Sequence, residues 1–192
     1  MAPEINLMHH PNSLEVTQSA LLIIDMQEAF RSKLADFKEV AERIAIMVQA
    51  ARLLKVPTLV TEQYPKGLGH TATEIKEQLA DDVPIIEKSA FSSCGARTFR
   101  IELGNTKARQ LLVCGIEAHI CVNQTTHDLL ASGFQVHLIT DCITSRQQAS
   151  KKVALKKMQM SGAIISSVEM ALFELLRDAK HEQFKAVQGL IK

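Results

Sequence analysis

Short apolar runs alternate along the chain with segments whose apolar positions recur every three or four residues. The first run, residues 20–25, is apolar as far as Asp25, which is typical of a strand buried on both faces. Residues 36–54 carry apolar side chains at helical spacing, and Asp36 precedes them as a candidate N-cap. The other predicted strands cover 57–61, 83–88, 109–115, 134–141 and 162–166, and the other predicted helices cover 73–79, 97–103, 119–132, 146–160 and 168–178.

Strands and helices that alternate at this interval are typical of βαβ crossovers. The sequence therefore predicts an α/β fold of the Rossmann-like type, with three layers and a mostly parallel six-stranded sheet in the middle. Residues 1–17 follow no period and are expected to form an N-terminal arm, and residues 18–192 a single domain. Ligands of such folds bind beyond the carboxyl ends of the strands.

Composition and charge narrow the classes of partner. Lys and Arg number 22 against 21 Asp and Glu, and there is one Tyr and no Trp, so nucleic-acid binding is disfavoured. No apolar run reaches the ~20 residues of a membrane span, and the first residues lack the regions of a signal peptide. We therefore expect a cytoplasmic protein that binds a small molecule, with no nucleic-acid partner, no membrane partner and free thiols at its four cysteines.

Three residues with reactive side chains fall at the expected ligand-binding edge of the sheet. Asp25 ends the first strand, Lys88 ends the third, and Cys121 lies at the start of the helix after the fourth. A helix N-terminus and a nearby ammonium group both lower the pKa of a thiol, and a carboxylate can accept its proton. The residue types alone leave simpler roles open, because a cysteine can be packed in the core, an acid can cap a helix and a lysine can be solvated.

Longer sequence motifs surround these three residues. The segments ALLIIDMQEAF, EKSAFSSC and GIEAHICVNQTTHDLLASGFQVHLITDCITSR resemble, in order and spacing, those of the isochorismatase-like cysteine hydrolases, and the resemblance covers residues 18–177. TEQYPKGLG and GIEAHICV resemble the isochorismatase domain-containing branch in particular. The resemblance implies the isochorismatase-like hydrolase fold and a catalytic triad, in which Asp25 matches the general base, Lys88 the triad lysine and Cys121 the nucleophile.

The resemblance also implies details of the reaction. It places a cis peptide bond between Ile116 and Glu117, which would set the N–H of Glu117 beside that of Cys121 as an oxyanion hole. The implied activity is hydrolysis of a C–N bond of amide or ureide type in a small molecule, through an acyl-enzyme on Cys121. Members of the family commonly form homo-oligomers, so a dimer or a larger assembly is expected.

No metal or other cofactor is expected. The metal-dependent nicotinamidase branch carries an Asp-x-His pair after the second strand, whereas this chain has TEQY at residues 61–64, and His70 stands alone. The expected enzyme is therefore a metal-independent hydrolase of the amidohydrolase type.

Four further residues are expected, by their positions, to line the substrate pocket, with packing or surface roles as the alternative for each. They are Gln27, Tyr64, Phe91 and His119. The alternative function is a catalytically silent binding or scaffold protein that keeps the hydrolase fold.

Overall fold

One sheet of six parallel strands runs through the middle of the molecule, in the order β3-β2-β1-β4-β5-β6. This computed structural model describes residues 9–192. The parallel α/β fold expected from the strand–helix alternation is confirmed. The strands are β1 (Ser19–Ile24), β2 (Thr58–Gln63), β3 (Ile85–Lys88), β4 (Gln110–Gly115), β5 (Gln135–Ile143) and β6 (Ile164–Ser166).

The order of the strands marks where a ligand can bind. From β1 the chain moves outward through β2 to β3, and then returns to the other side of β1 to form β4. The carboxyl ends of β1 and β4 therefore flank the point at which the winding direction changes, which is the usual ligand crevice of an open parallel sheet. Every residue of β1 and β4 is buried, as a central parallel strand requires.

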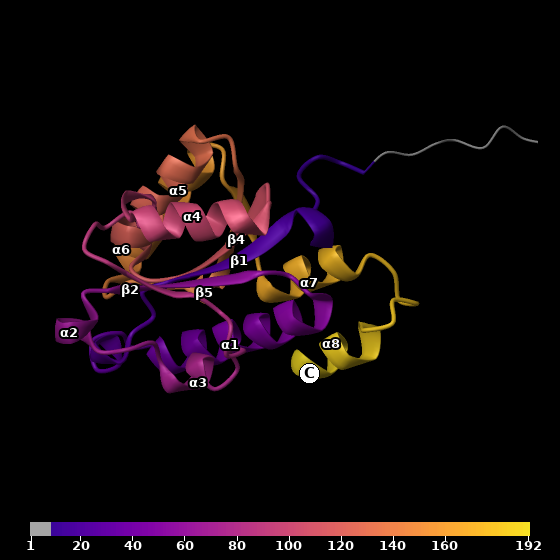
Figure 1. The fold of residues 1–192 in the computed structure, drawn as a ribbon, viewed down its shortest axis with the longest axis horizontal. Helices are drawn as coiled ribbons and strands as arrows, with labels where there is room; N and C mark the ends of the chain where they lie inside the picture. Colours follow the sequence, from indigo (N-terminus) through magenta and orange to yellow (C-terminus); the bar gives the residue numbers. More distant parts are fainter. Residues whose placement is uncertain (1–8) are drawn as a thin grey trace, which may run out of the picture.

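Helices cover both faces of the sheet (Figure 1). One layer contains α1 (Phe37–Leu54), α3 (Thr73–Lys76), α7 (Val168–Leu176) and α8 (Phe184–Leu190). The other contains α4 (Arg97–Thr106), α5 (Asn123–Ala131) and α6 (Gln148–Met160). Within the described residues, each helix is too short or too polar to span a bilayer.

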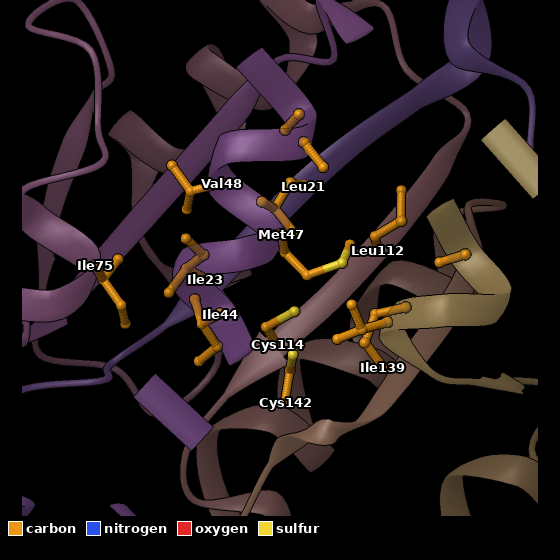
Figure 2. Close-up of a cluster of buried hydrophobic side chains, with 14 of the residues drawn as sticks. Leu21, Ile23, Ile44, Met47, Val48, Ile75, Leu112, Cys114, Ile139 and Cys142 are labelled. Atoms are coloured by element: carbon orange, nitrogen blue, oxygen red, sulfur yellow. The ribbon is translucent and has the colours of Figure 1, made fainter. Parts of the chain in front are cut away.

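The core beneath α1 shows how the apolar pattern becomes packing (Figure 2). Ile44 and Met47 of α1 belong to one cluster with Leu21 of β1, and all three are almost completely buried. Cys114 of β4 and Cys142 of β5 lie in the same cluster with no exposed surface, so both are small core residues. The second cluster, on the opposite face of the sheet, includes Cys121.

Several local expectations were inexact. Asp36 occupies the N-cap position of α1, but its carboxylate accepts from the Thr144 hydroxyl at 2.8 Å and caps no N–H. Residues 62–71, for which no strand or helix was predicted, contain the end of β2 and a short helix, α2 (Pro65–Leu68). Residues 1–8 of the expected N-terminal arm lie outside the described residues. Farther along the arm, Leu14 is fully buried, and its N–H donates to the Glu174 carboxylate at 3.1 Å.

Candidate active site

Asp25 follows the last residue of β1, and its backbone turns into the left-handed region with φ of 51°. Its N–H donates to the carbonyl oxygen of Thr61 at 3.0 Å. Its carboxylate accepts from the Thr61 hydroxyl at 2.8 Å and from the Lys88 ammonium at 2.6 Å. The side chain is therefore held at the sheet edge by β2 on one side and by β3 beyond it.

Lys88 is the last residue of β3, and its side chain has no exposed surface. Besides Asp25, its ammonium group donates to the side-chain oxygen of Gln63 at 2.8 Å and to the carbonyls of Ala90 and Phe91 at 3.2 and 3.1 Å. An ammonium has three N–H bonds, so four acceptors occupy it completely. A buried ion pair of this kind keeps both charges only while both partners are present.

The segment after β4 brings Cys121 to the same edge of the sheet. Gly115 ends that strand with φ of +116°, and a Cβ atom there would lie 2.0 Å from the carbonyl oxygen of Ile24. Only glycine permits so close an approach to β1. The peptide bond between Ile116 and Glu117 is cis, and a π-helical turn over Ala118–Val122 then carries Cys121 ahead of α5.

The structure brings Asp25, Lys88 and Cys121 together. Cys121 and Asp25 line the same cavity, and the Asp25 carboxylate is paired with Lys88. Burial raises the pKa of Cys121 to about 12, and the negative charge of Asp25 adds to the effect, with Lys88 opposing it. Burial also raises the pKa of Asp25 above its usual value, again against Lys88.

The raised pKa of Cys121 corrects the expectation from the sequence that the helix N-terminus and the lysine lower it. Lys88 is already neutralised by Asp25 at 2.6 Å, so burial and the nearby carboxylate outweigh both favourable effects. At neutral pH the resting cysteine is therefore a protonated thiol that shares its cavity with a carboxylate. This arrangement can pass a proton from sulfur to oxygen when a reaction partner stabilises the resulting charge.

A cavity of about 140 Å³ lies over Cys121 and Asp25. Phe91, expected as a pocket residue, lines it with 55% of its surface exposed. Sequence reasoning missed most of the other lining side chains, because they come from several loops whose approach depends on the tertiary fold. The complete lining is Asp25, Phe30, Gln63, Leu68, Phe91, Ile116, Glu117, Ile120 and Cys121.

Three expected pocket residues lie outside this lining. The amide of Gln27 is buried and donates to the carbonyls of Gln63 and Gly69 at 3.0 and 2.6 Å, so it fastens the loop after β2. The Tyr64 side chain is 61% exposed and lies over the Cα atom of Gly67. The ring of His119 lies 3.1 Å from the hydroxyl of Ser145.

Glu117 has two features at the cavity. Within residues 9–192, its backbone N–H donates to no acceptor, so that group is available to a ligand. Its carboxylate is buried and accepts from the backbone N–H of Arg146 at 3.0 Å and from Nε of the same residue at 2.9 Å. Only the backbone of Glu117 was expected at the site, and no signal in the sequence indicated a role for its carboxylate.

The described residues contain no group of three His, Cys, Asp or Glu side chains placed to hold a metal ion. Glu62 and His70 form a pair at 3.1 Å on the loop side of β2. The other carboxylate oxygen of Glu62 accepts from the N–H and hydroxyl of Thr71 at 2.6 and 2.7 Å. Glu62, near the end of β2, therefore fastens the following loop through His70 and Thr71.

Comparison with known proteins places this geometry in a family. The model of the Isochorismatase domain matches residues 19–170. The chain belongs to the isochorismatase family. Isochorismatase domain-containing protein 2 of Macaca fascicularis is 43% identical over 174 residues, which are 91% of this chain and 83% of that protein. The secreted isochorismatase effector Isc1 of Phytophthora sojae is 41% identical over 177 residues, which are 91% and 84% of the two chains.

Solved structures of family proteins have the same fold. The MAR1 ribonuclease structure from Caenorhabditis elegans is 42% identical, covers 93% of this chain and 92% of its own, and superposes with a TM-score of 0.89. The YcaC gene product of Escherichia coli, described as an octameric hydrolase of unknown specificity, is 21% identical with a TM-score of 0.88, over 96% and 91% of the two chains. The hydrolase fold of the isochorismatase family therefore extends over nearly the whole chain.

Proposed function

We propose that this protein is a metal-independent cysteine hydrolase that cleaves a C–N bond of amide or ureide type in a small molecule. The observation that carries the proposal is the cavity that Cys121 and Asp25 line together, with the Asp25 carboxylate paired with Lys88 at 2.6 Å. Membership of a family with a hydrolase fold supports it.

The first half of the reaction forms the acyl-enzyme. The thiol proton of Cys121 passes to Asp25 as sulfur attacks the carbonyl carbon, and the carbonyl oxygen takes up the negative charge. The N–H groups of Glu117 and Cys121 are proposed to hold this oxyanion, since the former has no other acceptor among the described residues. When the C–N bond breaks, Asp25 returns the proton to the leaving nitrogen.

The second half releases the product. Asp25, ionised again, takes a proton from a water molecule as the water oxygen attacks the thioester carbon. Asp25 then gives this proton to sulfur as the C–S bond breaks. Lys88 is proposed as a positioning residue, because its ammonium is surrounded by four acceptors and does not line the cavity. Its role is to keep Asp25 ionised and correctly oriented before each proton transfer.

Two other activities compete with this proposal. A similar structure from Caenorhabditis elegans is named a ribonuclease, which makes RNA cleavage a candidate. A cavity of about 140 Å³ with mostly apolar lining and no cationic side chain among its described residues fits a phosphodiester poorly. A catalytically silent binding protein is the other alternative, and it predicts a cavity that binds a ligand without turning it over.

The test is a panel of small amides and ureides incubated with the protein in the presence and absence of a chelator, with a single-stranded RNA as a separate substrate. We expect release of amine or ammonia that the chelator does not affect, loss of that activity in Cys121→Ala, and retention in the matched Cys94→Ala variant. Intact mass after rapid acid quenching should show an acyl adduct on Cys121. RNA cleavage without amide turnover would contradict the proposal, and so would ligand binding with no turnover.

Assembly and location are further predictions. We propose a homo-oligomer, dimeric or larger, a proposal supported by the octameric Escherichia coli YcaC structure. Light scattering of the purified chain tests it, and a monomer across micromolar concentrations would contradict it. We also propose a cytoplasmic location, which imaging of the tagged protein would test, since the Phytophthora sojae relative is named as secreted.

A further inference from the structure

The charges around the cavity indicate what kind of substrate it accepts. Two carboxylates, those of Asp25 and Glu117, belong to residues that line it. Among the described lining residues there is no Lys, Arg or His. The cavity therefore offers no free cation that could bind an anionic ligand.

Two cations beside the cavity, Lys88 and Arg146, are already paired with its carboxylates. Lys88 has no exposed side-chain surface, and its ammonium donates to four acceptors, including Asp25 at 2.6 Å. Arg146 donates through its backbone and side chain to the carboxylate of Glu117, outside the lining. Each cation balances one of the two carboxylates, so neither is free to neutralise a third negative charge.

The size of the cavity and its apolar walls also restrict the substrate that it can accept. Five of the nine lining residues are apolar: Phe30, Leu68, Phe91, Ile116 and Ile120. A cavity of about 140 Å³ is far smaller than the roughly 300–1,000 Å³ of sites for drug-sized ligands. It is close to an apolar cavity of about 150 Å³ that accepts benzene, a molecule of about six carbon atoms.

We infer that the substrate of this site carries a compact, uncharged acyl group with an apolar flank, about six non-hydrogen atoms in size, and that anionic acyl groups are excluded. The inference rests on the proposed hydrolysis at Cys121 and names its substrate class. It also bears on product release, because hydrolysis turns the neutral acyl group into a carboxylate whose charge no free cation of the described lining balances.

A pair of alkylating reagents of nearly equal shape tests the charge. Iodoacetamide is neutral and iodoacetate is anionic. With either reagent the S–C bond forms, iodide leaves, and the thiol proton passes to Asp25 or to solvent. The rates at Cys121 in the intact protein are measured at pH 8.5 by peptide mass spectrometry, and each is divided by the rate for a neutral reference thiol, N-acetylcysteine amide. We expect the normalised preference of Cys121 for iodoacetamide to be at least tenfold.

Phe91→Arg places a cation at the exposed rim of the cavity and should reduce this preference at least fivefold, whereas the uncharged Phe91→Met should retain it. Equal normalised rates in the wild-type protein would overturn the charge inference and leave the nucleophile proposal intact. If Cys121 instead reacts with neither reagent faster than the buried Cys114 and Cys142, and the amide panel gives no turnover, the proposed function fails and the substrate class fails with it.

Size is tested by protection of Cys121 from iodoacetamide. Isobutyramide should slow the alkylation, whereas isobutyrate, its anionic counterpart, and the bulkier diphenylacetamide should not at the same concentration. Protection by isobutyrate equal to that by isobutyramide would overturn the exclusion of anions. Equal protection by diphenylacetamide would overturn the size limit.

Discussion

Replacement of Asp25 by Asn should make Cys121 more reactive toward iodoacetamide while abolishing amide hydrolysis. The carboxylate of Asp25 has two opposite effects at this site. It raises the pKa of the Cys121 thiol, which stands at about 12, and it is the proposed acceptor of the thiol proton during acylation. The amide that replaces the carboxylate in the variant carries no charge, so the Lys88 ammonium loses the ion-pair partner that it has at 2.6 Å in the wild type. The thiolate of Cys121 then becomes its counter-ion.

The size of the effect follows from Coulomb's law. Two unit charges about 4 Å apart interact by about 4 kcal/mol at an effective dielectric constant of about 20. Loss of that repulsion increases the thiolate population at pH 8 by roughly a thousandfold. A less basic thiolate is a weaker nucleophile, which with a Brønsted coefficient of about 0.4–0.5 removes roughly 20-fold of the gain. The net expectation is an alkylation rate roughly 50-fold higher than in the wild-type protein.

The assay is the alkylation rate of Cys121 between pH 6 and pH 10 in both proteins, with melting curves to confirm that the variant is folded. A double variant, Asp25→Asn with Lys88→Met, is the matched control, because it removes both charges and should lose most of the increase. A lower rate in Asp25→Asn than in the wild type would refute the reasoning. It would mean that Asp25 already delivers the thiolate in the resting protein.

Three further predictions concern stability and are measured by urea denaturation. Lys88→Met leaves the buried Asp25 carboxylate without a partner and should lower the free energy of unfolding by about 3–5 kcal/mol at pH 7.5, with most of the loss recovered when Asp25→Asn is added. Burial lowers the pKa of His137 to about 4 from its usual 6.5, so between these values the unfolded chain binds a proton that the folded protein does not. The free energy of unfolding should therefore fall by about 3 kcal/mol as the pH falls from 6.5 toward 4. The variant His137→Gln should lack this loss. Gly115→Ala should cost more than about 4 kcal/mol, since its Cβ would lie 2.0 Å from the last carbonyl oxygen of β1, whereas Gly162→Ala, with open space around it, should cost only about 1–2 kcal/mol.

The parallel fold was predictable because its strands are buried on both faces. In a chain that alternates strands with helices, a short continuous apolar run such as β1, ended by an acid, fits a central strand and little else. The last helix, α8, was not predicted, since only Val187 within it is fully buried and its seven residues give a weak periodic signal. The short α2 was also missed, because its Pro and Gly residues indicate a loop by composition.

The candidate site was predictable only in part. The positions of Asp25, Lys88 and Cys121 after three strands follow from topology, since parallel strands end at one edge of the sheet. The protonation state of Cys121 does not, because it depends on how deeply the thiol is buried and on which charge already occupies the lysine. The lining of the cavity was equally out of reach, since Phe30, Leu68 and Ile120 meet there only after their loops have packed.

The same electrostatics account for both the resting thiol and the proposed substrate class. With a neutral thiol, Asp25 and Lys88 cancel, and the cluster carries no net charge. Transfer of the proton from Cys121 to Asp25 moves the negative charge onto sulfur without changing that total. A neutral substrate therefore reacts with no change in the charge of a buried region. An anionic substrate would add a negative charge there that no cation among the described lining residues balances. A site that binds neutral acyl groups can accordingly keep its nucleophile protonated until a carbonyl oxygen and its N–H donors are in place to accept the charge.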